Sequence, residues 1–322
     1  MISLVQLGTV DYATGLRLQE QLVALRKEEK IGDVLLLLEH SPVITLGRNA
    51  KAANVVASPD LLKQRGVELF ECDRGGDVTF HGHGQIVGYP IFDLRGYANS
   101  HSLSSRAEEN DSKSRSLESR DLVFPARKHI GVIEFVRRLE EVLIRTCIDF
   151  AIPTKRVAGL TGVWTDVGCV GADAFVRPDE PQARPEAVGD NHTAGLRPPG
   201  TDECVRPYTT EAKVAAIGVH VSRFVTSHGF ALNVNTDLSY FNLIVPCGIT
   251  AKPVTSMQQE LGKPLDLNAV AESISRNFGV VFQSQILWVD TLDALLGHTV
   301  GVPMKVPAEL RKLRQEDDIH FA

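Results

Sequence analysis

The sequence predicts an α/β (α+β) fold in which a mixed β-sheet is flanked by helices. Three observations support this prediction. Amphipathic helical segments alternate along the chain with short apolar runs typical of strands, and two of these runs show the residue alternation that is typical of an antiparallel pair. In addition, 43% of the 322 residues are hydrophobic. A chain of this length and composition can bury a large core. We predict one main domain over residues 1–261 and a mainly helical C-terminal extension over 262–322.

The N-terminal part is predicted to form a helix followed by buried strands. Residues 11–30 place leucines and a valine among charged residues at helical spacing, and VLLLLEH at 34–40 is an apolar run that fits a buried strand. After a proline, VITLG at 43–47 restarts an extended segment. Ser58 is predicted to cap a short helix because Pro59 follows it, at the first helical position, where proline is favoured.

The middle of the chain is predicted to supply further strands and a long helix. VELFECD at 67–73 and YPIFDL at 89–94 are typical of strands, and residues 74–88 between them are predicted to form a glycine-rich loop. GVIEFVRRLEEVLIRTCIDF at 131–150 has the spacing of an amphipathic helix. VAAIGVHVS at 214–222 and FALNVN at 230–235 are predicted to pair as antiparallel strands.

Two segments interrupt this pattern and are predicted to be polar surface insertions. Residues 99–121 are nearly free of large apolar side chains, and residues 171–211 are rich in Pro, Gly, Asp, Glu and Arg. Neither segment can bury enough apolar surface to offset the entropy lost on ordering. Because the core-like pattern resumes after each, we interpret them as insertions and not as linkers between domains.

Composition and charge exclude several classes of protein. The net charge of −6 gives no overall positive field that would attract nucleic acid, so no nucleic-acid partner is expected. No apolar run reaches the roughly 18 residues that a membrane helix needs, so no membrane partner is expected either. The N-terminus lacks the pattern of a secretory signal, which predicts a cytoplasmic protein.

The five cysteines are judged one by one. They are widely spaced, odd in number and form no C-x-x-C pair, which argues against a disulfide framework and against a zinc site. Cys72, Cys147 and Cys169 are predicted to be small buried apolar residues, and Cys204 lies in an insertion. Cys247 differs from these because it follows the apolar run FNLIV within Pro-Cys-Gly, where the next residue leaves the thiol sterically open.

Two further features could carry chemistry. The stretch RGGDVTFHGHGQ at 74–85 has four glycines and two histidines, so its backbone can approach a ligand closely, although a structural turn is the alternative. It matches neither of the common phosphate-binding patterns. Lys213 begins an apolar strand and is either an ordinary solvated strand end or, if it faces Cys247, a base that exchanges a proton with the thiol.

Taken together, these segments resemble the lipoyl(octanoyl) transferase family, which transfers octanoyl groups in lipoate biosynthesis. The resemblance rests on motifs in one order: EHSPVITLGRNAKAANV, RGGDVTFHGHGQIVGYPIFDL, GLTGVWTD, KVAAIGVHVSRFVTSHGFALNVNTDLSYFNLIVPCGI and VTSM. They cover most of residues 31–97 and 124–257 apart from the insertions. The family implies the α/β architecture that it shares with lipoate and biotin protein ligases.

The resemblance also implies a mechanism and a set of site residues. Its catalytic cysteine falls on Cys247 and its catalytic lysine on Lys213, and it implies a Cys thioester intermediate without any cofactor or metal. The segments that line the family's substrate pocket correspond to Arg74, Gly75, Gly76, Asp77, Val78, Thr79, Phe80, His81, Ala216, Ile217, Gly218, Gly229, Phe230 and Ala231.

By the same resemblance, the donor is octanoyl acyl carrier protein and the acceptors are lipoyl domains of 2-oxoacid dehydrogenase complexes and the H protein of glycine cleavage. A monomer is expected. Because carrier proteins are acidic, we predict a local basic patch formed by Arg48, Lys51, Arg74 and Lys155. The chain departs from the family at His83, which stands where the loop usually has proline.

Two other functions stay open from the sequence. An ATP-dependent lipoate–protein ligase shares the fold class but activates a free acid and needs no cysteine nucleophile. A non-catalytic regulator or scaffold could have kept the fold and could use the insertions to bind partners. Activity that survives Cys247→Ala would favour the ligase, and an inert Cys247 thiol would favour the regulator.

Overall fold

The computed structural model describes residues 1–97, 129–165, 211–248, 252–289 and 291–296. Both predicted insertions lie outside the described residues, except for Glu211 at the end of the second. Within the described part of the chain, no helix has the length and apolar character needed to cross a membrane.

The described residues contain one large mixed sheet, in the order β11-β1-β2-β6-β10-β9-β8-β7. Strand β1 pairs in parallel with β2 and β11, and the other neighbours are antiparallel. The strands are β1 (Ile2–Val10), β2 (Asp33–His40), β6 (Gln85–Ile91), β7 (Thr154–Val157), β8 (Leu160–Thr165), β9 (Lys213–Ser222), β10 (Val225–Asn233) and β11 (Ile286–Trp288).

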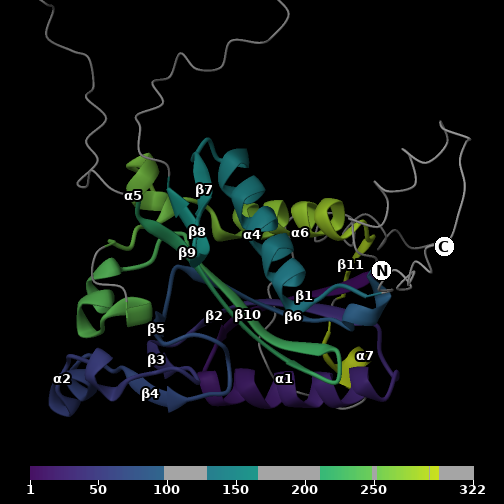
Figure 1. Ribbon diagram of the computed structural model, residues 1–322, viewed down its shortest axis with the longest axis horizontal. Coiled ribbons are helices and arrows are strands. Elements are labelled where there is room, and N and C mark those ends of the chain that lie inside the picture. The colour runs from purple at the N-terminus through teal and green to yellow at the C-terminus, as the bar shows by residue number, and fades with distance from the viewer. Residues whose placement is uncertain (98–128, 166–210, 249–251, 290, 297–322) are drawn as a thin grey trace, which may run out of the picture.

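Helices cover both faces of this sheet, as Figure 1 shows. Helices α4 (Val132–Asp149) and α6 (Leu267–Phe282) pack on one face, where Phe135, Phe278 and Phe282 lie in the largest core cluster. Helix α1 (Tyr12–Lys27) covers the other face through Leu18 and Leu22, beside the short α7 (Asp293–Leu296). This arrangement confirms the predicted mixed sheet flanked by helices.

A smaller sheet lies beside the large one and forms one wall of the site described below. Its order is β4-β3-β5, with β3 parallel to β4 and antiparallel to β5. The strands are β3 (Val43–Leu46), β4 (Glu68–Glu71) and β5 (Val78–His81), with α2 (Pro59–Gln64) nearby. The short helical elements are η1 (Ala52–Asn54), η2 (Leu94–Gly96), η4 (Leu238–Leu243), η5 (Pro246–Gly248) and α5 (Met257–Leu261).

Several local predictions are confirmed by the hydrogen bonds that they required. The Ser58 side chain accepts a hydrogen bond from the Leu61 amide at the start of α2, as an N-cap does. The predicted antiparallel pair is the β9–β10 hairpin. The predicted glycine-rich loop at 74–88 is shorter than expected, because Val78 to His81 form β5 and Gln85 already begins β6. The alternating apolar and polar side chains of Val78 to His81 favour a strand, although glycines lie on both sides of this segment.

The described part of the predicted C-terminal extension joins the core of the main domain. Helix α6 packs against α4, and β11 pairs with β1, so that Ile286 lies opposite Ile2. Strand β1 itself had no assignment from the sequence, although its burial on both faces makes it a central element of the sheet.

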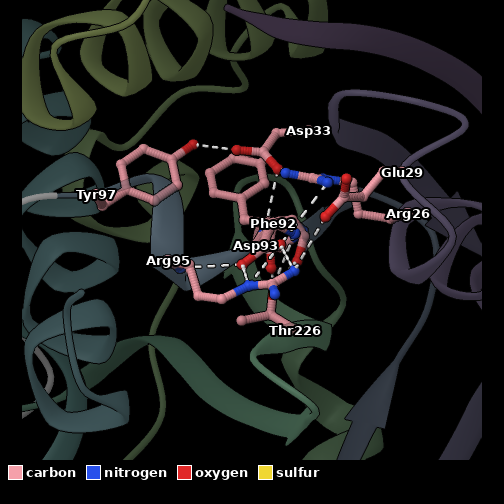
Figure 2. Close-up of polar contacts among 9 residues, drawn as sticks. Arg26, Glu29, Asp33, Phe92, Asp93, Arg95, Tyr97 and Thr226 are labelled. Atoms are coloured by element: carbon pink, nitrogen blue, oxygen red, sulfur yellow. Dashed lines mark hydrogen bonds and ion pairs between the residues drawn. The ribbon is translucent and has the colours of Figure 1, made fainter. Parts of the chain in front are cut away.

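A polar network at the end of β6 fastens α1 to the sheet (Figure 2). Arg26 lies 2.8 Å from Asp33 and 3.8 Å from Asp93, and Tyr97 donates a hydrogen bond to Asp33 at 2.6 Å. Hydrogen bonds and charge from Arg95, which outweigh the effect of burial, hold the pKa of Asp93 below its ordinary value. The network thus joins α1, β2 and the loop after β6.

Candidate active site

A cavity lies where strands β6, β9 and β10 meet the loop before β5 and the start of α1. Twelve of the predicted site residues line it: Arg74, Gly75, Gly76, Asp77, Thr79, His81, Ala216, Ile217, Gly218, Gly229, Phe230 and Ala231. The structure therefore brings the segment 74–81 together with the β9–β10 hairpin, which lies far from it in the sequence.

Val78 and Phe80 are the two predicted lining residues that the cavity wall does not include. Both lie on the opposite face of β5 and pack into a core cluster with Phe241 and Leu243. Successive side chains of a strand point to opposite faces, so β5 turns Thr79 and His81 toward the cavity and Val78 and Phe80 away from it.

Four lining residues were missed from the sequence: Tyr12, Val87, Tyr89 and His228. His228 directly precedes the predicted Gly229, so the SHGFALN motif offered a signal for it. Tyr12 offered none, because the first residue of α1 reaches the cavity only through the packing of α1 on the sheet.

The floor of the cavity is the β9–β10 hairpin, in which small residues of the two strands pair with one another. Gly229 pairs with Gly218, and Ala231 pairs with Ala216. A Cβ atom on Gly218 would lie 2.6 Å from the Gly75 carbonyl oxygen, closer than real contacts allow. Glycine at 218 thus lets the loop before β5 lie directly over the hairpin.

Arg74 fixes this loop from inside the protein. Its guanidinium donates to the Thr45 carbonyl at 2.7 Å and to the Thr45 hydroxyl at 2.9 and 3.1 Å, and the residue is buried. The adjacent Gly75 amide donates to the Val219 carbonyl at 3.1 Å. Because Arg74 is committed to Thr45, it cannot belong to the surface patch predicted from the sequence.

The other members of that predicted patch are placed as follows. Arg48 and Lys51 are exposed on the turn after β3, next to the loop before β5. Lys155 lies on β7, 3.5 Å from Glu211. The exposed basic residues beside the loop are therefore Arg48 and Lys51.

His81 is held in one neutral tautomer. Gln85 donates from Nε2 to the Phe80 carbonyl at 3.2 Å, so its Oε1 faces His81 Nδ1 at 2.8 Å and must accept the proton of that nitrogen. His81 Nε2 is then an acceptor. Burial, with smaller effects from His40 and Arg74, lowers the pKa of His81 to about 3, so the ring offers a lone pair and no proton at neutral pH.

A second buried histidine lies behind the cavity. His40 Nδ1 lies 2.7 Å from the Val10 carbonyl and must donate to it, so Nε2 accepts from the Tyr89 hydroxyl at 2.6 Å. Burial lowers the pKa of His40 to about 4. The Tyr12 ring packs edge-on against the His40 ring with 5.3 Å between ring centroids. This aromatic and histidine cluster supports the lining residues Tyr12 and Tyr89.

Lys213 is the first residue of β9, and it is buried against Trp164. Its Nζ lies 5.1 Å from the centroid of the Trp164 ring, within the range of a cation–π contact. A Cβ atom on Gly162 would lie 2.7 Å from Lys213 Cε, so this glycine leaves room for the lysine side chain. The backbone of Lys213 pairs with the segment 253–255, through hydrogen bonds of 2.8 and 2.9 Å to Pro253 and from Thr255.

The turn η5 carries Cys247 between Pro246 and Gly248. Gly248 has a φ of 65°, and its amide donates to the Val245 carbonyl at 3.1 Å. A Cβ atom on Gly248 would lie 2.9 Å from Asp77 Oδ2. The backbone of the Cys247 turn therefore lies against the loop that lines the cavity.

The remaining cysteines follow the predictions only in part. Cys147 is fully buried, as predicted, and burial raises the pKa of its thiol to about 12. Cys72 is half-buried, with Sγ donating to the Leu46 carbonyl at 3.4 Å, so its prediction as a buried apolar residue is wrong. Cys169 and Cys204 lie outside the described residues.

An acidic side chain joins two histidines at the edge of the cavity. Asp73 accepts a short hydrogen bond from His220 and another from His228 at 2.6 Å. Burial raises the pKa of Asp73, but the hydrogen bonds and charges of His228 and His220 outweigh it, so that the net pKa is lowered. Burial lowers the pKa of His228. This cluster ties the residue before Arg74 to both strands of the hairpin.

Comparison with known proteins places these features in a family. Residues 11–109 and 121–279 match the family described as the lipoyl protein ligase A/B catalytic domain. The octanoyltransferase of Koribacter versatilis is 52% identical over 321 residues, covering 100% of both chains. The octanoyltransferase of Acidobacterium capsulatum is 45% identical over 298 residues, covering 92% of this chain and 96% of that protein.

Solved structures share the fold at low sequence identity. LipL1 of P. falciparum in complex with lipoate has a TM-score of 0.54 at 10% identity, covering 93% of this chain and 69% of that one. A bipartite lipoate protein ligase from Thermoplasma acidophilum has a TM-score of 0.52 at 12% identity, covering 92% and 89%. At these identities the likeness is one of fold.

Proposed function

The chain belongs to the octanoyltransferase family, and from that premise we propose that it carries the octanoyl group as a thioester on Cys247 while Lys213 transfers the protons. The acyl transfer itself follows from the family: the protein is an octanoyltransferase of protein lipoylation. Family membership alone does not identify the atoms of this chain that perform the transfer.

The observation that carries the proposal is the shared position of Lys213 and the chain that follows Cys247. Lys213 pairs in parallel with Val254, and the segment from Pro253 to Thr255 is hydrogen-bonded to it on both sides. The turn that carries Cys247 comes shortly before this segment in the sequence and lies against Asp77 of the cavity loop. The Cys247 turn thus borders the cavity loop, and the segment that follows it pairs with Lys213 at the start of β9, a strand of the cavity floor.

The chemistry proceeds in two balanced steps. The Cys247 sulfur attacks the carbonyl carbon of the donor thioester, the Lys213 amine takes the thiol proton, and that proton passes to the departing donor thiol. An acceptor lysine amine then attacks the new thioester, an amide bond forms, and the proton lost by the attacking nitrogen returns through Lys213 to the Cys247 sulfur. Thioester exchange is nearly neutral in free energy and amide formation is downhill, so the proposal needs no ATP, cofactor or metal.

The cavity is suited to the acyl chain. Ala216, Ile217, Phe230 and Ala231 give it apolar walls, and the glycines of the hairpin leave space between them. Burial of six or seven methylenes would contribute roughly 5 kcal/mol at about 0.8 kcal/mol each. We propose that the octanoyl group lies along the hairpin, with its carbonyl end toward the Cys247 turn.

We propose octanoyl acyl carrier protein as the donor and the lysine of a lipoyl domain as the acceptor, including the lipoyl domains of 2-oxoacid dehydrogenase complexes and the H protein of glycine cleavage. Both follow from octanoyl transfer in lipoylation. Each partner presents its reacting group on a long arm, the pantetheine of the carrier or the lysine of the domain, which suits a reacting site beside a narrow cavity.

The test is a mass measurement on the intact protein. The protein is incubated with octanoyl acyl carrier protein, without ATP or metal, alongside Cys247→Ala and Lys213→Ala. The proposal expects a mass gain of one octanoyl group on the wild type, removed by neutral hydroxylamine and absent from both variants. Cys72→Ser and Lys252→Ala are the controls, because Cys72 is a half-buried thiol elsewhere in the chain and Lys252 is a second lysine at the Trp164 ring, and both variants should keep the adduct.

Two outcomes would contradict the proposal. An adduct that persists in Cys247→Ala would place the acyl group on another residue. The absence of any adduct, with octanoylation of a lipoyl domain only when ATP and free octanoate are supplied, would indicate ligase chemistry.

A further inference from the structure

A chain of buried side chains connects the cavity wall to the segment that pairs with Lys213. His81 donates to Gln85 at 2.8 Å, Gln85 donates to Asn233 Oδ1 at 2.8 Å, and Asn233 donates from Nδ2 to the Thr255 carbonyl at 2.9 Å. Thr255 in turn donates from its amide to the Lys213 carbonyl at 2.9 Å. The chain crosses from β5 through β6 and β10 to the segment after Cys247.

The direction of every hydrogen bond in this chain is fixed. The Phe80 and Thr255 carbonyl oxygens can only accept, so Gln85 and Asn233 must each present their NH₂ group to a backbone carbonyl. The Asn233 oxygen then accepts from Gln85 and the Gln85 oxygen accepts from His81. Neither amide can be reversed without placing two acceptors, or two donors, against each other.

Burial makes the chain rigid. Gln85 is 1% exposed, Asn233 is 4% exposed and Thr255 is fully buried, so water cannot replace a lost bond. A buried polar group without a partner is costly, which favours one arrangement of all the members. The segment 253–255, and with it the backbone of Lys213, is therefore held in one register relative to His81.

We propose that Asn233 is a positioning residue for the acyl transfer, because its amide holds the segment that pairs with Lys213 in register with the cavity wall that carries His81. This inference rests on the proposed role of Lys213. Asn233 does not touch the reacting atoms in this account. It acts through Thr255, whose carbonyl it binds, and its loss moves the lysine relative to the cavity and slows the reaction without weakening donor binding.

Asn233→Asp tests this, because the carboxyl group has the shape of the amide but can donate to the Thr255 carbonyl only when it is protonated. In its ionised form two acceptors face each other. We expect acyl-enzyme formation by Asn233→Asp to be about 10- to 100-fold slower than wild type near pH 8, with the KM for octanoyl acyl carrier protein little changed. Burial favours the neutral carboxyl group, so the ratio of the variant rate to the wild-type rate should rise on acidification, following one proton.

Asn235→Asp is the matched control. Asn235 also holds a backbone segment, donating to the Leu265 carbonyl at 2.7 Å and accepting from the Leu265 amide at 2.9 Å, but Leu265 does not pair with Lys213. Its rate ratio should stay flat across the same pH range. If Asn233→Asp is not folded near pH 8 by circular dichroism, Gln85→Glu replaces it, since a protonated carboxyl group there restores the bond to Asn233.

The outcomes separate this inference from the proposed function. A rate ratio for Asn233→Asp that is independent of pH, or equal to that of Asn235→Asp, would overturn the positioning role while the Cys247 adduct still forms in the wild type. A Lys213→Ala variant that forms the adduct at the wild-type rate would instead refute the proposed function, and the positioning role with it.

Discussion

The Lys213 Nζ atom lies 5.1 Å from the centroid of the Trp164 ring, and the two residues are neighbours on paired strands β8 and β9. Trp164 is buried, with 1% of its surface exposed, so the contact is shielded from solvent. A second lysine nitrogen, Nζ of Lys252, lies 5.8 Å from the centroid of the same ring and donates to Glu211 at 2.6 Å. The ring therefore fixes where the proposed proton carrier lies.

Replacing Trp164 with Leu should slow acyl-enzyme formation, because a cation–π contact worth about 0.5–2 kcal/mol no longer holds the Lys213 side chain. We expect a decrease of roughly threefold to thirtyfold in the single-turnover rate, measured by intact mass at fixed times. Trp288→Leu on β11 is the control, since Trp288 lies at the far edge of the sheet. Equal rates for the two variants would contradict a role of the Trp164 indole in positioning Lys213.

Enlarging Ala216 should shorten the preferred acyl chain. Ala216 lines the floor of the cavity opposite Ala231, so a Leu side chain at 216 would fill part of the space for the methylenes. We expect Ala216→Leu to prefer four- or six-carbon acyl donors over octanoyl donors, at about 0.8 kcal/mol for each methylene excluded. The measurement is kcat/KM over a series of acyl carrier protein thioesters. An unchanged preference would mean that the chain binds elsewhere.

Reversing the charge of Arg48 and Lys51 should weaken recognition of an acidic carrier protein. Both are exposed beside the loop that lines the cavity. Arg48→Glu with Lys51→Glu should raise the KM for octanoyl acyl carrier protein and leave the KM for octanoyl-pantetheine unchanged, because the small donor makes no surface contact. The wild-type rate should also fall with added salt, which screens charges beyond about 10 Å at 0.1 M.

Lys30→Glu, just beyond the C-terminal end of α1, controls for net charge when it is compared with Arg48→Glu alone, because the two substitutions change the net charge equally. A rate that does not depend on salt, or an equal effect of Lys30→Glu, would contradict the docking surface.

Acidification should destabilise the protein through its buried histidines. Burial lowers the pKa of His40 to about 4 and of His81 to about 3, whereas the unfolded chain binds these protons near pH 6.5. The unfolded state therefore gains protons first as the pH falls from 6.5, and stability is lost by up to about 1.4 kcal/mol per pH unit for each histidine. Above pH 6.5 neither group contributes a pH dependence.

Urea unfolding at several pH values between 4.5 and 7.5 would measure this slope. His40→Gln, whose amide can still donate to Val10 and accept from Tyr89, should reduce the slope by about one proton. His83→Gln, the same substitution at an exposed turn, is the control for the exchange of the side chain itself. A slope in His40→Gln that equals the wild-type slope would show that His40 is protonated in the folded protein.

Local structure was largely predictable because it depends on neighbours in the sequence. The spacing of apolar residues located α1, α4 and the β9–β10 hairpin, and Ser58 with Pro59 located the start of α2. The ordered motifs located the family and three segments of the cavity. All of these signals are carried by residues within a few positions of one another.

The tertiary structure decided what depends on segments that meet from far apart. Strand β11 pairs with β1 across nearly the whole chain, and Tyr12 reaches the cavity only because α1 packs on the sheet. The side chains of Val78 and Phe80 on β5 point away from the cavity. No local sequence pattern determines which face of a short strand lies toward a cavity. The bond from Asn233 to Thr255 likewise exists only in the folded protein, because burial of both groups is what makes each require the other.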